Sequence, residues 1–253
     1  MYSFSDLLKG FQAIPLTTGR AIMVHSSYKS LGGVAGGAET VIDALLEWVG
    51  NEGTVLLPTF NFVSWSENHY FDIAETPSHM GIIGELARKR PQAVRTPHPM
   101  YPFAALGEQK DEFGACDDIE AFGPNSVFAC FHKLNGIIVS IGLHWNHTFT
   151  IHHYVEYRTG CAYRRVKHFA GTYIGYDRVP RLKTYSMFVR KDERVVTDIA
   201  AGMGELHASG VIGTTRVGDA IAHYASAEDF FENMSVIVRQ HPEKLHRIKQ
   251  PTF

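Results

Sequence analysis

The sequence predicts an α/β fold with an antiparallel appendage in its second half. Two short apolar runs, Ala21–His25 and Thr54–Leu57, flank a segment with helical spacing of apolar residues, Ala38–Val49. A third apolar run of the buried-strand type follows at Gly136–Gly142. Beyond Tyr163 the pattern alternates more strongly, which is typical of antiparallel strands.

The first elements follow directly from these patterns. Ser3–Gly10 is a short amphipathic helix, and Gly50–Gly53 stops the helix that covers Ala38–Val49. Because a strand, a loop, a helix and a strand follow one another, we expect two parallel neighbouring strands joined by a right-handed crossover.

The middle of the chain is less regular. Phe60–Ser78 is aromatic and polar without a period, so we expect a long loop or lid there. Met80–Arg90 and Pro124–Lys133 are helix candidates, and Phe103–Gly107 is a brief strand. Val94–Tyr101 contains two prolines and must be extended or turned.

In the second half we expect antiparallel strands at Thr172–Tyr176, Lys183–Arg190 and Arg194–Val196. Gly218–Asn233 is a helix candidate, and the polar tail from His241 to Phe253 is expected to fray. A length of 253 residues fits one domain or two packed lobes, residues 1–160 and 161–253.

Composition excludes several classes of protein. Hydrophobic residues make up 45% and charged residues 20%, which argues against disorder. A net charge of −2 implies no basic face, so nucleic acid is not an expected partner. No apolar run approaches a membrane span, and Met1–Lys9 lacks the features of a signal peptide. Three cysteines are too few for a disulfide framework. We therefore expect a soluble cytoplasmic enzyme.

A Ser/Gly-rich loop, Ser26–Gly37, joins the first strand to the second helix. In open α/β sheets ligands bind outside the carboxyl ends of strands, and glycines permit close backbone approach to an anion. The loop matches neither of the common nucleotide-binding glycine patterns, so spacing alone leaves ligand binding and a structural turn both open.

The segment Arg95-Thr-Pro-His-Pro99 carries a guanidinium and an imidazole on a proline-stiffened backbone. The guanidinium of Arg95 can bind a phosphate or carboxylate through two hydrogen bonds, and His98 lies between two prolines. The alternative is a turn whose arginine serves only the fold.

Histidines are abundant, 14 in all, and several lie between His144 and His153. Thr150, His153 and Glu156 recur at spacings of three, so they share a face if a helix begins near Thr148 or Thr150. An imidazole beside a hydroxyl and a carboxylate is typical of a general base with an orienting partner. Burial would keep His153 neutral and able to accept a proton.

Metal binding is the competing chemistry. His153 and Glu156 can supply two ligands from one helix, and His144 or His147 a third. The sequence lacks a His-Glu-x-x-His motif. A further alternative is that these histidines are core or surface residues with no chemical role.

Five stretches in order together resemble the aminoglycoside 3-N-acetyltransferase family and its relatives, the N-acyltransferases of nucleotide-linked amino sugars. They are His25-Ser-Ser with Leu31-Gly32 and Gly36-Gly37, then Gly53-Thr-Val-Leu-Leu-Pro-Thr59, Met80-Gly81, Arg95-Thr-Pro-His-Pro99 before Phe103–Gly107, and Thr150-x-x-His153-x-x-Glu156. The resemblance covers about residues 20–165.

The resemblance implies a central mixed sheet flanked by helices and an acyl-CoA co-substrate, with no metal. It implies that acyl-CoA binds at Ser26, Ser27, Ser30, Leu31, Gly32, Gly36 and Gly37, and that His153, Glu156 and Thr150 are catalytic. Arg95, Thr96, His98, Asn146 and His147 are expected to bind substrate or support the site.

The substrate expected from the residues is a nucleotide-linked (dTDP-type) amino-dideoxy sugar used in surface-glycan synthesis. Arg158, Arg164, Arg165 and Lys167 suit a diphosphate better than a polycation. An aminoglycoside is the alternative, and a homo-oligomer is compatible with the sequence. Rivals from other classes are a metal-dependent hydrolase and a carbohydrate-binding module based on the aromatic residues Phe60–Tyr70.

Overall fold

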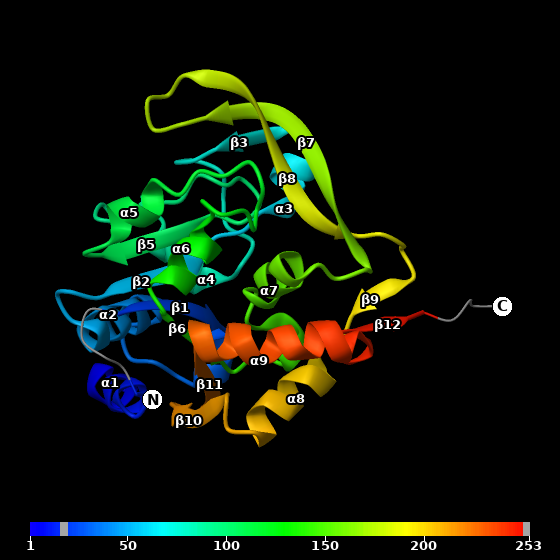
Figure 1. Ribbon diagram of the computed structural model, residues 1–253. Coiled ribbons are helices and arrows are strands. Elements are labelled where there is room, and N and C mark those ends of the chain that lie inside the picture. The colour runs from blue at the N-terminus through cyan, green and yellow to red at the C-terminus, as the bar shows by residue number, and fades with distance from the viewer. Residues whose placement is uncertain (16–19, 250–253) are drawn as a thin grey trace.

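A seven-stranded mixed sheet forms the centre of the protein. A computed structural model describes residues 1–15 and 20–249 (Figure 1). The strand order is β10-β11-β6-β1-β2-β5-β4, in which β6, β1 and β2 are parallel and the others antiparallel. Their bounds are β1 Ala21–Ser26, β2 Thr54–Pro58, β4 Val94–Arg95, β5 Phe103–Gly107, β6 Ile137–Ile141, β10 Gly213–Val217 and β11 Ala220–Ser226. The mixed sheet, with β1 and β2 as parallel neighbours, is confirmed.

Helices cover both faces of this sheet. Successive side chains of a strand point to opposite faces, so Met23 lies in one core cluster and Val24 in the other. One face is covered by α1 (Phe4–Gln12), α2 (Ala38–Val49) and α4 (Ile82–Ala87). The other is covered by α6 (Val127–Lys133), α7 (His152–Thr159), α8 (Ala200–Ala208) and α9 (Ala227–Gln240). The parallel strands are therefore buried from both sides, as continuous apolar runs predict.

The ends of the first two helices follow the sequence signals. Ser3 caps α1, and Asp6 returns a bond to the backbone of Ser3, which completes a capping box. The helix α2 has the predicted bounds and ends at Gly50, whose φ is +70°.

The antiparallel appendage is also confirmed. A long hairpin of β7 (Arg164–Ile174) and β8 (Pro180–Arg190) arches along the top of the molecule in Figure 1, and α7 lies between it and the central sheet. A second small sheet pairs β9 (Val195–Thr197) with β12 (His246–Ile248). The predicted tail therefore contains a strand, and its last residues, 250–253, lie outside the described part of the chain.

The prediction of a long loop or lid at Phe60–Ser78 is wrong. This segment contains α3 (Phe62–Ser66) and β3 (Tyr70–Asp72), and β3 pairs with β7. Trp65 is fully buried, and its indole Nε1 donates to the carbonyl of Phe169 at 3.0 Å. The aromatic residues lack a local period because they pack against a hairpin that comes about a hundred residues later.

The helix expected at Gly218–Asn233 is partly wrong. Residues 220–226 form β11, which pairs with both β10 and β6, and α9 begins only after Ser226. The sequence pattern of a short, Ala-rich segment such as β11 is compatible with a helix or a strand. Pairing with the neighbouring strand β6 makes it a strand here. The elements β10, α8 and α5 (Lys110–Gly114) were not predicted.

The two halves of the chain are interwoven. The strand β11 from the second half joins the central sheet beside β6, and β3 from the first half joins the hairpin. Residues 1–160 and 161–253 thus share both larger sheets. Within residues 1–15 and 20–249, no helix combines the length and apolar character that crossing a bilayer requires.

Candidate active site

A cavity of about 840 Å³ lies at the carboxyl ends of the parallel strands. His25 and Ser26 at the end of β1, Pro58 at the end of β2 and Leu143 just after β6 line one side of it. Because parallel strands end at the same edge of a sheet, this is the place where such folds bind ligands.

The second half of the chain supplies the opposite wall. The lining residues there come from β7, β8, β9, β12 and the segment after β9: Arg164, Met187, Arg190, Val196, Thr197, Asp198 and Arg247. The cavity therefore exists only when the hairpin and the small β9–β12 sheet are folded onto the central sheet.

Close backbone approach brings the first loop against the histidine-rich segment. Gly142 follows β6 with φ of +63°, and a Cβ atom there would lie 2.3 Å from the Cβ of Ser30. The Ser30 hydroxyl donates to the carbonyl of Gly142 at 2.9 Å. Gly142 thus allows the turn that holds Ser30 to lie beside the segment that carries the histidines.

The chain enters α7 through a left-handed residue. Phe149 has φ of +45° and is fully buried, and a bulky residue in this region is a backbone outlier. Thr150 comes next, before the helix begins, and its Oγ1 lies 2.8 Å from Nε2 of His25. The prediction that Thr148 or Thr150 caps the helix is wrong, because α7 starts at His152 without a side-chain cap.

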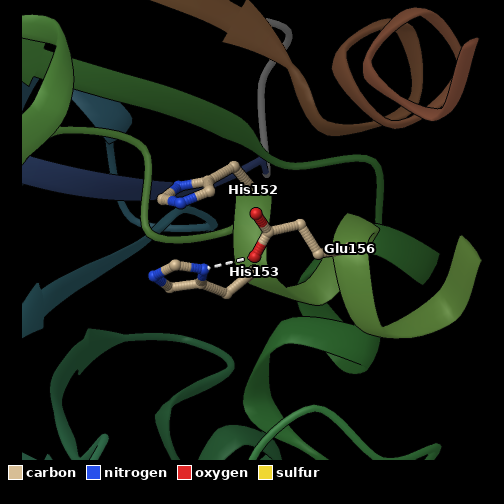
Figure 2. A group of neighbouring side chains, drawn as sticks. All are labelled: His152, His153 and Glu156. Carbon is tan, nitrogen blue, oxygen red and sulfur yellow. Dashed lines mark hydrogen bonds and ion pairs between the residues drawn. The ribbon is translucent and has the colours of Figure 1, made fainter. Parts of the chain in front are cut away.

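His153 and Glu156 form a hydrogen-bonded pair on the first turns of α7. Nδ1 of His153 lies 2.7 Å from Oε2 of Glu156, as Figure 2 shows. An ionised carboxylate can only accept, so Nδ1 carries the proton and donates. Nε2 is left with its lone pair, and His153 lines the cavity. The pairing expected from the spacing of three is present.

Glu156 is fully buried and held by two further groups. The Tyr163 hydroxyl donates to Oε1 at 2.5 Å, and Nε of Arg164 lies 2.8 Å from Oε2. A buried carboxylate requires such partners to remain ionised. The sequence suggests a substrate contact for Arg164 and no role for Tyr163, whereas the tertiary contacts place both beside Glu156.

The protonation state of His153 suits a base. Burial, together with the positive charge of Arg164, holds the pKa of His153 well below its usual value of 6.5. His153 is therefore neutral at pH 7, as the sequence predicted, and its Nε2 can accept a proton from a ligand in the cavity.

Three side chains of metal-ligating type meet here. Ligand atoms of His152, His153 and Glu156 lie within 4.8 Å of one another (Figure 2). His144 and His147, the third ligands named in the metal-binding alternative, do not belong to this group. The guanidinium of Arg164 already neutralises Glu156, so a cation placed at that carboxylate would meet a positive charge.

A smaller cavity of about 410 Å³ adjoins the first. Ser26, Met80 and Leu143 line both cavities. Of the loop residues predicted to bind acyl-CoA, Ser26 and Ser27 line the smaller cavity, whereas Ser30, Leu31, Gly32, Gly36 and Gly37 lie outside the lining of both. The other seven lining residues had no predicted role in binding: Tyr28, Lys29, Met80, Gly81, Ile82, Ile83 and Leu143.

The segment from Arg95 to His98 lies outside both cavities and supports the fold. Thr96 accepts a bond from the amide of Phe103. His98 is buried, and burial lowers its pKa to about 4. Its Nδ1 faces the amides of Met100 and Tyr101 at 3.4 and 3.3 Å. None of the residues from Arg95 to His98 lines the cavity beside His153, whereas Tyr101, the neighbour of His98, does.

Arg95 is 2% exposed and has no carboxylate partner among the described residues. Its guanidinium donates to the hydroxyl and carbonyl oxygens of Thr59 and to the carbonyls of Ile73 and Thr76, at 2.5 to 3.2 Å. It also lies over the ring of Phe71. Arg95 therefore ties β2 to the segment that contains β3.

We expect Arg95→Met to lower the free energy of unfolding by about 3 kcal/mol or more, because it leaves several buried acceptors without donors. Arg181→Met is the matched control: Arg181 pairs with Asp177, and both side chains are about half exposed. That variant should lose only a small part of this stability. Urea unfolding measures both, and equal losses would contradict the assignment.

Asn146 and His147 line the main cavity, and their expected role in binding substrate or supporting the site stays a prediction. The side chain of Asn146 donates to Asp198 at 3.1 Å and accepts from the amide of Ile199 at 2.8 Å. Asn146 therefore fixes the cavity wall at Asp198, a lining residue that sequence reasoning missed and that no local signal marks.

Sequence comparison identifies relatives of this chain. A model of the family described as aminoglycoside 3-N-acetyltransferase matches residues 23–238. Aminoglycoside N(3)-acetyltransferase VII of Streptomyces paromomycinus is 32% identical over 168 residues, 58% of each chain. The SPbeta prophage-derived aminoglycoside N(3')-acetyltransferase-like protein YokD of Bacillus subtilis is 29% identical over 60% of this chain and 64% of its own. The matches thus span less than two thirds of these relatives.

Solved structures share the fold. AAC-IIIb, in a binary complex with CoASH, superposes with a TM-score of 0.83 at 22% identity and covers 99% of each chain. AAC-VIa with bound sisomicin gives a TM-score of 0.80 at 24% identity over 93% of this chain and 97% of its own. Since the family model matches most of the sequence, the chain belongs to the aminoglycoside 3-N-acetyltransferase family.

Proposed function

We propose that this protein is a CoA-dependent N-acetyltransferase that acylates an amine of an aminoglycoside-type amino sugar. The observation that carries the proposal is the His153–Glu156 pair, which presents a neutral imidazole to the main cavity. Membership of the family supports the reaction class.

The chemistry assigned to His153 follows from its surroundings. An amine reaches the site mostly as ammonium and must lose a proton before it can attack a thioester. Nε2 of His153 takes that proton, and the imidazolium that forms lies against the Glu156 carboxylate. Tyr163 and Arg164 keep the carboxylate in place throughout.

The two adjoining cavities fit an acyl-CoA and an acceptor. The smaller one is lined by Ser26–Lys29 and Met80–Ile83, a mixture of apolar walls and hydroxyls suited to a pantetheine arm. Lys29 is exposed at its edge, where a cation can pair with phosphate. Ser26, shared by both cavities, then lies where the thioester meets the amine. The assignment of acyl-CoA to Ser30, Leu31, Gly32, Gly36 and Gly37 stays a prediction.

The relatives favour an aminoglycoside over the nucleotide-linked amino sugar that the residues suggested, because the relatives and solved structures described above bear the names of aminoglycoside acetyltransferases. One observation favours testing the nucleotide-linked amino sugar as well, namely the charge of the cavity wall. Asp198 is the only acid among the lining residues of the main cavity in the described chain, beside Arg164, Arg190 and Arg247. A polycation gains little electrostatic binding energy from a wall with one aspartate and three arginines.

Thiol release tests the proposal. Purified protein with acetyl-CoA should release free CoA in the presence of an aminoglycoside, and initial-rate lines should intersect, because no nucleophilic cysteine borders the cavity among the described residues. A dTDP-amino sugar is the second arm, and a simple monoamine is the control. CoA release with the dTDP-amino sugar but not with the aminoglycoside would make the nucleotide sugar the substrate. CoA release in the absence of any amine would refute the proposed function.

A further inference from the structure

His25 has a place in the site that the reaction proposed above does not yet use. Its imidazole is 5% exposed and lines the main cavity. Its Nε2 lies 2.8 Å from Oγ1 of Thr150, and its Nδ1 has no hydrogen-bond partner among the described residues. Thr150 and His153 line the same cavity.

The charge state of His25 limits what the contact can be. Burial lowers the pKa of His25 to about 4, so the ring is neutral at pH 7 and carries one proton. If that proton were on Nδ1, a buried N–H would lack an acceptor, while Nε2 would accept the Thr150 hydroxyl proton. If it is on Nε2, only a lone pair lacks a partner.

The second arrangement costs less, because buried N–H groups without acceptors are rarer in proteins than unused lone pairs. Nε2 of His25 then donates to Oγ1 of Thr150. The oxygen of Thr150 is occupied as an acceptor, and its own O–H is left free to donate. The backbone supports this orientation, since the left-handed residue Phe149 sets the start of the turn and Thr150 accepts the amide of His153 at its carbonyl.

We propose that His25 is a positioning residue that fixes the Thr150 hydroxyl as a hydrogen-bond donor to the oxyanion formed during acyl transfer. This rests on the proposed N-acetyltransferase function. The ammonium first loses one proton through His153 to bulk solvent, and the neutral amine nitrogen then forms a bond to the thioester carbon while a second proton passes to His153. The carbonyl oxygen gains negative charge, which Thr150 stabilises, until the C–S bond breaks and the sulfur takes the proton back from His153.

The arrangement also assigns different work to two neighbouring groups. His153 handles the proton of the amine, and Thr150 faces the oxygen of the thioester. A carbonyl bound between them is attacked on the side of the base. The loss of one such donor commonly lowers turnover by about 10²–10³-fold.

A double-mutant cycle tests the proposal with acetyl-CoA and the best amine from the thiol-release assay. Thr150→Val keeps the shape of the side chain and removes the hydroxyl, so kcat should fall by about 10²-fold or more, with little change in KM for acetyl-CoA. His25→Leu should cost about 10-fold or more in the native background and less than about twofold in the Thr150→Val background.

Two conservative variants separate positioning from folding. Thr150→Ser retains the hydroxyl and should keep most of the turnover. His25→Gln retains an N–H donor near the place of Nε2 and should recover most of what His25→Leu loses. Urea midpoints of all variants at pH 7 report whether the fold is maintained.

Three results would overturn the inference. Equal costs of His25→Leu in both backgrounds would show that His25 does not act through Thr150. Parallel initial-rate lines with acetylated Thr150 in the mass spectrum would mean that His25 instead accepts the Thr150 proton and makes it a nucleophile. Full turnover in Thr150→Val would show that the Thr150 hydroxyl does not stabilise the oxyanion. An absence of thiol release in the unmodified protein is a separate result, which refutes the proposed function itself.

Discussion

His153→Asn should lower kcat by about 10²–10⁴-fold, the usual range for the loss of a general base. Asparagine fits the space and can still donate to Glu156, but it cannot take the proton of the amine. Because the smaller cavity does not include residue 153, the affinity for acetyl-CoA should change little. Steady-state rates and titration with acetyl-CoA measure the two quantities.

His144→Asn is the matched control for this variant. His144 lies in the same histidine-rich segment, is exposed, and uses its side chain only to accept from the amide of Asn146, which asparagine can also do. Its turnover should be near normal. His98→Gln should likewise cost less in kcat than His153→Asn, since His98 lies outside both cavities. Near-normal turnover in His153→Asn would mean that another group is the base.

Stability should fall steeply in mild acid. Burial depresses the pKa values of His25 and His98 to about 4 and of His152 to about 3, and His153 is also well below 6.5. Unfolding restores ordinary values, so below pH 6.5 the unfolded chain binds protons that the native protein does not. The stability conferred by these neutral histidines is complete above pH 6.5 and is lost as the pH falls toward 4.

Each such histidine is worth up to about 1.4 kcal/mol per pH unit, so His25, His98 and His152 together should lower the free energy of unfolding by about 2–4 kcal/mol between pH 6 and pH 5, and His153 acts in the same direction. Urea unfolding at pH 7, 6 and 5 measures the slope. His98→Gln should reduce the slope by about a quarter, whereas His147→Asn, which changes an exposed histidine, should leave it unchanged. A flat profile between pH 7 and 5 would contradict burial of these rings in the neutral state.

The sequence by itself determined the elements whose signals are local. Helix α2 has a regular apolar stripe and a glycine at its end, and the parallel strands β1, β2 and β6 are short apolar runs, so each could be located without a structure. The spacing of His153 and Glu156 likewise predicted their pairing, because residues three apart on a helix are neighbours.

Family motifs indicated the candidate site but not the surroundings of each residue. Arg95 and His98 stand in a motif that resembles a binding segment, yet both are buried away from the cavities. The difference between a residue that binds a ligand and one that holds the fold lies in its surroundings. For Arg95 these are carbonyl oxygens that come from other segments.

Only the tertiary structure decided the rest. The aromatic segment around Trp65 has no period because its partner is a hairpin far along the chain, and β11 is a strand because β6 offers it an edge. The environment of His153 is of the same kind: Arg164 reaches Glu156 only after the chain has turned from α7 into β7. Contacts between distant segments leave no periodic trace in a single sequence, since each segment satisfies its partner rather than a local pattern.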